Sequence, residues 1–531
     1  MGCSLPKSAM NVLGICGRDR DAAAALSVDG RVVSAAVEES FARVPGIGYA
    51  QTGGFPSHAV EACLHAAGIE ARGIDEVVVV DDASAVLWPL PTPARVIDAA
   101  EADARHAAMT HPDAGAIVVC GANPPVLAVF RREGAKWGPR EDVAGAGGLF
   151  EGAERLASAL GLPATDPLAE LDRLALGAEP EFASEFAALL KLNDGASAMS
   201  ADPGLMVEAA HRIAGDHGPA LKDARSLNAR VQHIRRALAA SFTASLARIV
   251  ASVSDQAAGR NGSEQVGAGG GAFGNARLNS ELQGIVGHSL AFAAVPEPSG
   301  RALGALGSAA PGSDGALAIG PAFSEEAIKR TLDNCRLDYV YEPDWPRLLV
   351  RVSRMLAQGK VVGWFQGPMA FGPRPLGTRS ILADPSNRYA RQNVNEYLRD
   401  MPLDDPLPLV VAPSMADACL VWGLPAYGTR NVEVRPEWRT KLASALDGRH
   451  AARVHAPAVH FEPRFQDLLE RHNAATGTPG LIEISLAGAA EPIACTPRDA
   501  VRTMYSSAID ALVIGRFLLM KDYWLLRSQE Q

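Results

Sequence analysis

The chain has 531 residues, more than a single hydrophobic core normally holds, so several structural units are expected. Hydrophobic residues make up 48% and charged residues 21%, which excludes a disordered chain, a collagen-like chain and a small disulfide scaffold. Fifty basic side chains against sixty acidic ones give a net charge of −10. We therefore expect no binding to nucleic acid or to anionic membranes, whereas a small anionic ligand needs only a few local arginines.

The seven cysteines are scattered along the chain and include no CxxC pair. This usage is typical of reduced packing cysteines in a cytosolic protein. The first ten residues lack the apolar run of a signal peptide, and no stretch approaches the roughly 18–20 apolar residues that span a bilayer. We therefore expect a cytoplasmic protein that does not enter a membrane.

Strands and helices alternate in the first eighty residues. The apolar run at 11–16 predicts a strand, and Asp29-Gly30 between two alternating apolar runs predicts a hairpin. A helix is expected from Ser57, as its N-cap, to Gly68, and the apolar run IDEVVVVDD that follows predicts a buried strand. This alternation favours an α/β fold.

A long helical pattern over 224–254 leads into the glycine-rich segment VGAGGGAFGNARLN at 266–279. Ser324 is positioned to cap the helix that begins after it. The composition changes near residues 334–341, where alternation of strand and helix starts again. We therefore divide the chain into units 1–335 and 336–531.

The most informative stretch is VVGWFQGPMAFGPRPLGTRSILADP at 361–385. It predicts a strand, a loop rich in glycine and proline that carries Arg374 and Arg379, and a second strand. Two guanidinium groups on a loop whose glycines allow close backbone approach suit a phosphate or a carboxylate. The alternative is a surface turn whose arginines pair with Asp384 or with other acids.

This stretch resembles the C-terminal signature of the O-carbamoyltransferase family, which includes the tobramycin, cephamycin and nodulation-factor carbamoyltransferases. The glycine-rich segment given above resembles one of the family's two glycine-rich loops, and PSGRALGAL resembles the other. Further segments agree with the family in order and spacing, so the resemblance covers nearly the whole chain: 13–44, 53–56, 453–455, 465–485, 491–493 and 496–521.

The resemblance implies an enzyme of two parts. The N-terminal part would have the actin-like ATPase superfold with two ribonuclease H-like halves, and the C-terminal part would be YrdC-like. In such enzymes the YrdC-like part makes carbamoyl adenylate from carbamoyl phosphate and ATP. The N-terminal part then transfers the carbamoyl group to a substrate hydroxyl beside an iron-type metal ion. Arginines would stabilise the developing phosphate charge, and a metal would polarise the acyl group.

The resemblance also implies roles for particular residues. His106 and Arg374 would be catalytic. Carbamoyl phosphate and the nucleotide would be bound by basic and hydroxyl side chains of the C-terminal part and by the two glycine-rich loops: Arg374, Arg379, Ser380, Arg399, Arg453, Gly269, Gly270, Gly271, Gly300 and Gly304.

The sequence departs from the family at the metal positions. The family's two histidines at i and i+4 of one helix fall on Ala102 and His106, and its two aspartates fall on Cys120 and Ser299. A catalytic first-row metal generally needs about three protein ligands, so we predict that no metal is bound. An alternative metal site made of His106, His111 and Cys120 stays open.

The C-terminal part also departs from the family. The arginine that follows FQG in the family is Pro368 here, and the family's NTSFN loop begins with Glu483. Asp404 and Asp405 follow Arg399 closely. Acidic groups near an anion pocket would oppose phosphate binding.

Three functions remain in competition. The retained GPRPLGTRS string favours an active O-carbamoyltransferase of specialised metabolism with a small-molecule acceptor. The lost metal positions favour a catalytically weakened paralogue that serves as a structural or regulatory subunit, as a homodimer or with an intact carbamoyltransferase. A third hypothesis is transfer of another acyl or amidino group on the same scaffold without a metal.

Overall fold

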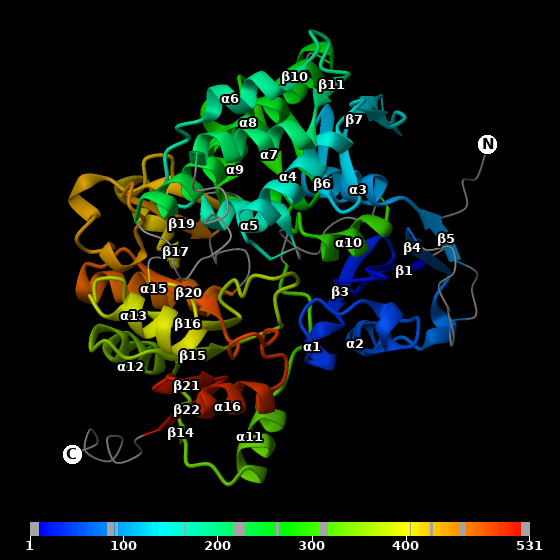
Figure 1. Ribbon diagram of the computed structural model, residues 1–531. Coiled ribbons are helices and arrows are strands. Elements are labelled where there is room, and N and C mark those ends of the chain that lie inside the picture. Colours follow the sequence, from blue (N-terminus) through cyan, green and yellow to red (C-terminus); the bar gives the residue numbers. More distant parts are fainter. Residues whose placement is uncertain are drawn as a thin grey trace.

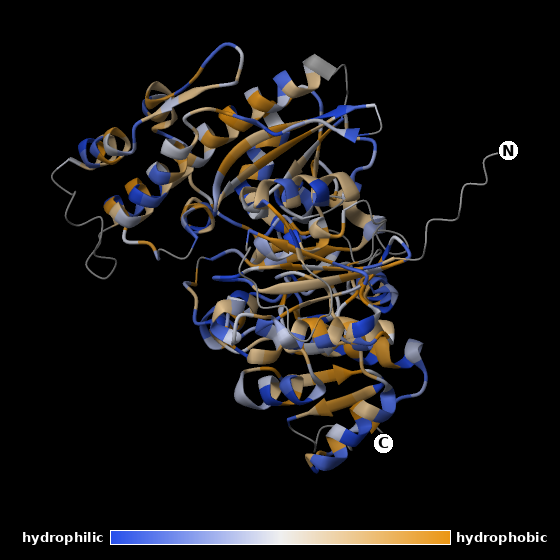
Figure 2. Ribbon diagram, turned by 90° about the vertical axis from the view of Figure 1, so that its right-hand side faces the viewer, coloured by the Kyte–Doolittle hydropathy of each residue, from blue (hydrophilic) through white to orange (hydrophobic). Residues whose placement is uncertain are grey.

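The computed structural model describes residues 10–81, 90, 94–134, 136–163, 166–215, 229–261, 265–307, 317–403, 405–424, 428–455 and 462–521. Two larger sheets lie in the N-terminal part and one long sheet lies in the C-terminal part (Figure 1). Helices cover these sheets, so the expected α/β class is confirmed. In Figure 2 the hydrophobic residues are concentrated on the strands, which lie inside the layers of helices.

The first sheet has the strand order β3-β2-β1-β4-β5. Its first three strands are antiparallel, and the last two continue parallel to the first strand. The predicted hairpin is confirmed, because Asp29 and Gly30 have φ angles of 53° and 74°, as a tight two-residue turn requires. The strands are β1 (Asn11–Cys16), β2 (Ala23–Val28), β3 (Arg31–Val37), β4 (Glu76–Val80) and β5 (Ala94–Ile97).

The second sheet repeats this order and polarity, as β13-β12-β6-β7-β8. An antiparallel pair is again followed by two strands parallel to the first one. Such a repeat is the arrangement that the resemblance implies for two ribonuclease H-like halves. The strands are β6 (Ala116–Ala122), β7 (Pro125–Glu133), β8 (Lys136–Trp137), β12 (Gln265–Gly269) and β13 (Ser289–Phe292).

The predicted helix at Ser57 forms as α2 (Ser57–Ala67), but Ser57 is not its cap. The N-cap position is Pro56, and the side chain of buried Glu38 accepts hydrogen bonds from the first amide groups, His58 N at 3.4 Å and Ala59 N at 2.8 Å. Gly68 ends the helix in the left-handed conformation, as predicted.

Helices fill the space around the second sheet. The longest, α8, runs over Ala229–Asn261, whereas the sequence predicts 224–254; residues 224–228 of that prediction lie outside the described residues. By length and composition α8 could cross a membrane, but 89% of its apolar window is buried inside the protein, as in a core helix. Its neighbours include α5 (Pro167–Leu174), α6 (Ala183–Leu189) and α7 (Pro203–Ala214), and α4 (Gly147–Ala159) packs against α5 and α7.

The C-terminal part is built on a nine-stranded sheet of order β14-β22-β21-β15-β16-β20-β17-β19-β18. Helices α12 (Trp345–Ala357) and α15 (Pro463–Thr476) cover one face, and α16 (Pro497–Ser506) packs beside β21. The strands are β14 (Val340–Tyr341), β15 (Val362–Phe365), β16 (Arg379–Ala383), β17 (Pro408–Val411), β18 (Thr429–Glu433), β19 (Ala451–His455), β20 (Gly480–Ser485), β21 (Ala511–Ile514) and β22 (Phe517–Met520).

Helix α11 (Glu325–Asn334) shows where the C-terminal core begins. Ser324 caps it by accepting a hydrogen bond from Ala327 N, as predicted. Its buried residues Ile328 and Leu332 pack into the core of the C-terminal part. That core therefore begins before the expected division at residue 335.

The loop between β15 and β16, residues 366–378, joins the two parts. Phe371 N donates to Leu317 O at 2.8 Å, and Phe371 and Leu376 share one apolar cluster with Val295 and Leu303 of the N-terminal part. The most informative stretch of the sequence thus also joins the two parts of the molecule.

Two glycines with the same backbone conformation isolate the packing of the joint loop against α15. Gly377 and Gly30 both have φ of 74°, but a methyl group on Gly377 would clash with the ring of Phe465, whereas Gly30 has open space. We predict that Gly30→Ala costs about 1 kcal/mol of left-handed strain and that Gly377→Ala costs a further 1–3 kcal/mol or so. Urea unfolding of both variants measures this difference, and equal midpoints would contradict the packing described for the joint.

Candidate functional site

Three of the predicted arginines gather where the two parts meet. Arg374 lies on the joint loop, Arg399 ends the π-helical turn Asn395–Arg399, and Arg453 lies on β19. We call these arginines and their neighbours the junction cluster: Arg374, Arg399, Arg453, Ser380, His455, Glu483, Asp172, Glu297 and Asp405.

Arg374 connects the two parts through an ion pair. Its Nη1 lies 2.5 Å from Oε1 of Glu297, and its Nη2 donates to Ala294 O at 3.3 Å. Only 9% of Arg374 is exposed. The sequence led us to expect a guanidinium facing a phosphate, and the structure instead gives its charge to a carboxylate of the N-terminal part.

Arg453 reaches across the same junction to Asp172 on α5. Its Nη2 lies 3.3 Å from Asp172 Oδ2, while Asp172 Oδ1 accepts a hydrogen bond from Arg277 N at 2.8 Å, in the first turn of α9 (Ala276–Ile285). Burial raises the pKa of Asp172, and the charge of Arg453 opposes this rise. Asp172 therefore ties the helix behind the first glycine-rich loop to the C-terminal sheet.

Arg399 has partners within the C-terminal part. Its Nη1 donates to Asn395 Oδ1 at 3.0 Å and to Asp405 Oδ2 at 3.2 Å. Burial lowers the pKa of Arg399, and the charge of Asp405 opposes this. The acid that we expected to oppose phosphate binding thus pairs with an arginine; Asp404 lies outside the described residues.

Arg379 differs from our expectation of a phosphate contact. Its side chain is fully buried, and Nη1 donates to the carbonyl groups of Gln366, Gly367 and Thr378 at 2.8–3.1 Å. Its guanidinium carbon lies 3.6 Å from the centre of the Phe365 ring. Burial lowers the pKa of Arg379 to about 9. This arginine holds the joint loop from inside, and its buried Nε has no hydrogen-bond partner among the described residues.

Ser380 donates to a buried carboxylate. Its Oγ lies 2.6 Å from Oε1 of Glu483, which also accepts a hydrogen bond from Gly377 N at 2.5 Å. Oε2 of Glu483 lies 3.7 Å from Nδ1 of His455, and neither atom has a hydrogen-bond partner. Burial lowers the pKa of His455, although Glu483 raises it. This pair was not predicted from the sequence, although Glu483 and the string RVH at 453–455 were each noted there.

The first glycine-rich loop follows β12. Gly269 and Gly270 are packed tightly, because a side chain would clash with the carbonyl groups of Asp103 and Cys120, and Gly270 has φ of 98°. Gly271 faces open space. Of these three glycines, Gly271 is therefore the one whose surroundings leave room for a ligand.

The second glycine-rich loop is a packing surface. A side chain on Gly304 would clash with the carbonyl group of Ala102, and one on Gly300 would lie 2.9 Å from Nδ1 of His106. These glycines let α10 (Arg301–Ala305) and the turn before it approach α3 (Ala99–Thr110) closely. In this structure the absent side chains of Gly300 and Gly304 serve helix packing, and their expected binding of phosphate stays a prediction.

His106 is enclosed by this packing. It is 3% exposed, and burial lowers its pKa to about 4, so it is an uncharged, packed side chain at neutral pH. The catalytic role expected from the sequence stays a prediction. Nε2 of His111 bonds to Phe292 O at 2.7 Å, and burial raises the pKa of Cys120 to about 12. Among the described residues no group of three His, Cys, Asp or Glu side chains could hold a metal. The residues present therefore do not fit the family's metal.

Every arginine of the junction cluster is paired, and its carboxylates outnumber its arginines by four to three. Each of its three arginines contacts a carboxylate, and a fourth carboxylate lies beside the histidine. An anionic ligand therefore competes with these carboxylates for the charge of the arginines.

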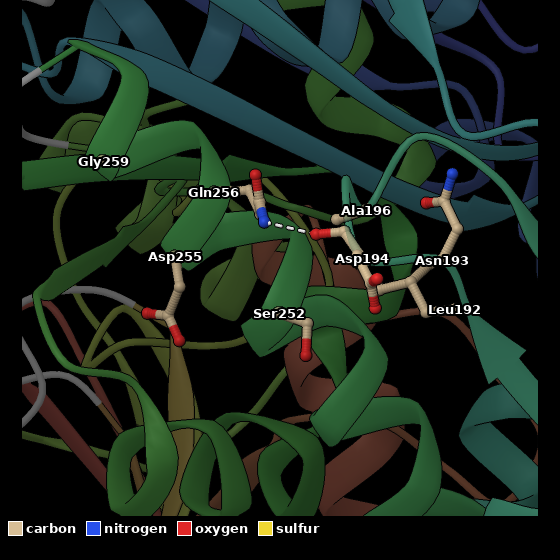
Figure 3. Close-up of a pocket in the computed structure, with 8 residues that line it drawn as sticks. All are labelled: Leu192, Asn193, Asp194, Ala196, Ser252, Asp255, Gln256 and Gly259. Carbon is tan, nitrogen blue, oxygen red and sulfur yellow. Dashed lines mark hydrogen bonds between the residues drawn. The ribbon is translucent and has the colours of Figure 1, made fainter.

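A solvent-open cleft of about 620 Å³ lies elsewhere, between α8 and the hairpin of β10 (Leu190–Leu192) and β11 (Met199–Ala201) (Figure 3). Gln256 Nε2 donates to Asp194 O at 2.8 Å across it. Its eight lining residues include Asp194 and Asp255 and no basic side chain, so the cleft does not suit phosphate.

A serine, a histidine and an aspartate near this cleft have the contacts of a hydrolase relay. Ser254 Oγ lies 2.7 Å from His288 Nε2, and His288 Nδ1 lies 3.0 Å from Asp255 Oδ1. Ser254 has no exposed surface, so no substrate reaches its hydroxyl group. The three residues tie α8 to the segment before β13.

Comparison with known proteins gives the family of the C-terminal part. The family model "Carbamoyltransferase C-terminus" matches residues 353–521, which include every junction residue of the C-terminal part. The resemblance found in the sequence is thereby confirmed over these residues.

Similar curated proteins include nodulation protein NolO of Bradyrhizobium diazoefficiens, 33% identical over 175 residues (31% of this chain and 31% of NolO). Nodulation protein U of Azorhizobium caulinodans is 29% identical over 240 residues (43% of this chain and 40% of that protein). The uncharacterized protein sll1178 of Synechocystis is 33% identical over 235 residues (40% of this chain and 38% of that protein). The chain thus spans less than half the length of these relatives.

Solved structures with a partial likeness include component A of the (R)-2-hydroxyglutaryl-CoA dehydratase of Acidaminococcus fermentans. It is 16% identical, with a TM-score of 0.33 over 56% of this chain and 96% of that one. HypF in its phosphate- and nucleotide-bound form is 11% identical, with a TM-score of 0.35 over 56% of this chain and 46% of that one. At such scores the fold rests on this chain's own strand order.

The buried His106 predicts a pH dependence of stability. Its folded pKa of about 4 lies below the value of about 6.5 in an unfolded chain. The unfolded state therefore binds the proton first, and about 3 kcal/mol of stability is lost as the pH falls from 6.5 to 4. His106→Gln should flatten this fall in urea unfolding, whereas His65→Gln, at an exposed position, should leave it unchanged. Equal pH dependence of the wild type and His106→Gln would contradict the assignment.

Proposed function

We propose that this chain, whose residues 353–521 form a carbamoyltransferase C-terminal domain, transfers a carbamoyl group to a hydroxyl of a small molecule in a biosynthetic reaction of the cytoplasm. The match over this domain, with three arginines gathered at its junction with the N-terminal part, carries the proposal. The C-terminal part would be YrdC-like and the N-terminal part would provide the transfer site, as the resemblance implies.

Carbamoyl phosphate and ATP would be the co-substrates. With one water molecule they yield carbamoyl adenylate, phosphate and pyrophosphate. The acceptor oxygen then attacks the carbamoyl carbon, the bond to the phosphate oxygen breaks, and AMP leaves while the hydroxyl proton passes to solvent. Arg374, Arg399 and Arg453 would bind the phosphate groups and stabilise the negative charge that develops on them.

The same arginines also support a second candidate function. A charge-assisted hydrogen bond is worth about 1.5–3 kcal/mol, and in this structure Glu297, Asp172 and Asp405 already take those bonds. A phosphate that replaces a carboxylate therefore gains only the difference between the free energies of the two contacts. This balance, together with the unfit metal positions, favours a weakened paralogue that acts as a subunit beside an intact carbamoyltransferase.

Pyrophosphate release tests the proposal directly. The purified chain should release pyrophosphate only when both carbamoyl phosphate and ATP are present. A subunit without its own chemistry releases none alone and instead changes the rate of an intact carbamoyltransferase. Pyrophosphate release from ATP alone at the same rate would contradict both functions.

Arg374→Ala should weaken the binding of carbamoyl phosphate by roughly tenfold or more, because a charge-assisted contact is lost and Glu297 is left without its cation. Arg347→Ala is the matched control, because Arg347 is an arginine of the C-terminal part paired with Asp344, with a 76% exposed side chain. Calorimetric titration measures both variants. If Arg374→Ala binds as tightly as the wild type, or if neither binds, the joint loop has only a structural role.

A further inference from the structure

A buried ion pair lies between helices α3 and α10. Nε of Arg301 is 3.2 Å from both carboxylate oxygens of Asp103, and Nη2 is 3.1 Å from Oδ2. Nη2 also donates to Asn123 O at 2.8 Å. The side chains are 10% and 3% exposed, so both charges are held away from solvent.

This pair lies where the two halves of the N-terminal part present the carboxyl ends of their strands. Asn123 follows β6, and the carbonyl group of Asp103 lies against Gly269, which ends β12. Cys16 ends β1 and Asp81 follows β4, and both act electrostatically on Arg301. Ligands of α/β folds bind at this edge of a sheet.

The pair also adjoins the positions where the resemblance places the metal. Asp103 follows Ala102 and lies three residues before His106 on α3, and Arg301 lies two residues after Ser299. Ala102 is part of an apolar cluster, and His106 faces Gly300. These residues do not provide the ligands that a metal ion needs, and the guanidinium group of Arg301 is fixed beside them.

We propose that Arg301, held by Asp103, substitutes for a metal ion as the fixed cation at this edge of the two sheets and as the cross-link between α3 and α10. This inference rests on the proposed function only for the place of the metal. A guanidinium is planar, permanently charged and cannot exchange with solvent, whereas a metal ion can. Its charge repels a divalent cation, and its bidentate contact with Asp103 uses the carboxylate nearest to the metal positions.

The pair predicts distinct effects of removing one charge or both. Breaking a buried pair on one side leaves an uncompensated charge, whereas replacing both partners by apolar residues is close to neutral. Arg301→Met should therefore lower the melting temperature by on the order of 10 °C, and Asp103→Leu/Arg301→Met by clearly less. Arg95→Met is the control, because Arg95 pairs with Glu76 on the same half of the molecule at an exposed site.

Metal analysis provides the decisive readout and does not depend on activity. Wild-type protein from metal-supplemented medium should carry well under one equivalent of iron, manganese or zinc, and EDTA or added Mn²⁺ should leave its melting temperature unchanged. In Arg301→Met, Asp103 and nearby Asp81 lack their cation, so Mn²⁺ should recover part of the lost stability. The double variant and Arg95→Met should not respond.

Two results would overturn the inference. One is near-stoichiometric metal in the wild type that is lost on His106→Ala, because this would show that a metal binds beside Arg301. The other is an Arg301→Met variant that is as stable as Arg95→Met and indifferent to Mn²⁺. If Arg301→Met does not fold, the metal content of the wild type and the stability of the double variant still decide. Failure of carbamoyl transfer leaves all these outcomes unaffected, so the two proposals fail separately.

Discussion

Each arginine buried between the parts of this molecule requires a carboxylate or a set of carbonyl groups to replace the water it has lost. Arg374 and Arg453 meet this requirement with Glu297 and Asp172 of the N-terminal part, and Arg379 meets it with carbonyl groups of its own loop and its surroundings. The pairing fixes the joint between the parts. It also determines how much free energy an anion must provide to compete with the carboxylates. Stability and ligand binding therefore depend on the same contacts.

The same requirement operates inside the N-terminal part. Arg301 and Asp103 bring a compensated charge to the edge where both halves present their strand ends. Gly300 and Gly304 allow the two helices to approach closely enough for this contact. Paired charges therefore lie both between the two parts and between the halves of the first part.

Local patterns in the sequence predicted the local structure well. The strand at 11–16, the hairpin at Asp29-Gly30 and the capping by Ser324 depend on residues close together in the chain, and all three are present. For the site, the sequence predicted where the arginines lie in the chain but not which side chains they contact. The partners of Arg374 and Arg453 are 77 and 281 residues away in sequence, and no periodicity or spacing reveals such contacts. For the same reason Glu38, 20 and 21 residues away, was missed as the group that binds the first amides of α2.

In this structure, carboxylates form ion pairs with the arginines that would bind the phosphate of the proposed substrate. Glu297→Gln tests this competition most directly, because the substitution keeps the shape of the side chain and removes the competing charge at Arg374. Titration calorimetry with carbamoyl phosphate at constant ionic strength compares this variant with the wild type. We expect Glu297→Gln to bind carbamoyl phosphate severalfold more tightly than the wild type does. Unchanged or weaker binding would show that Glu297 does not compete with the ligand and would contradict this expectation.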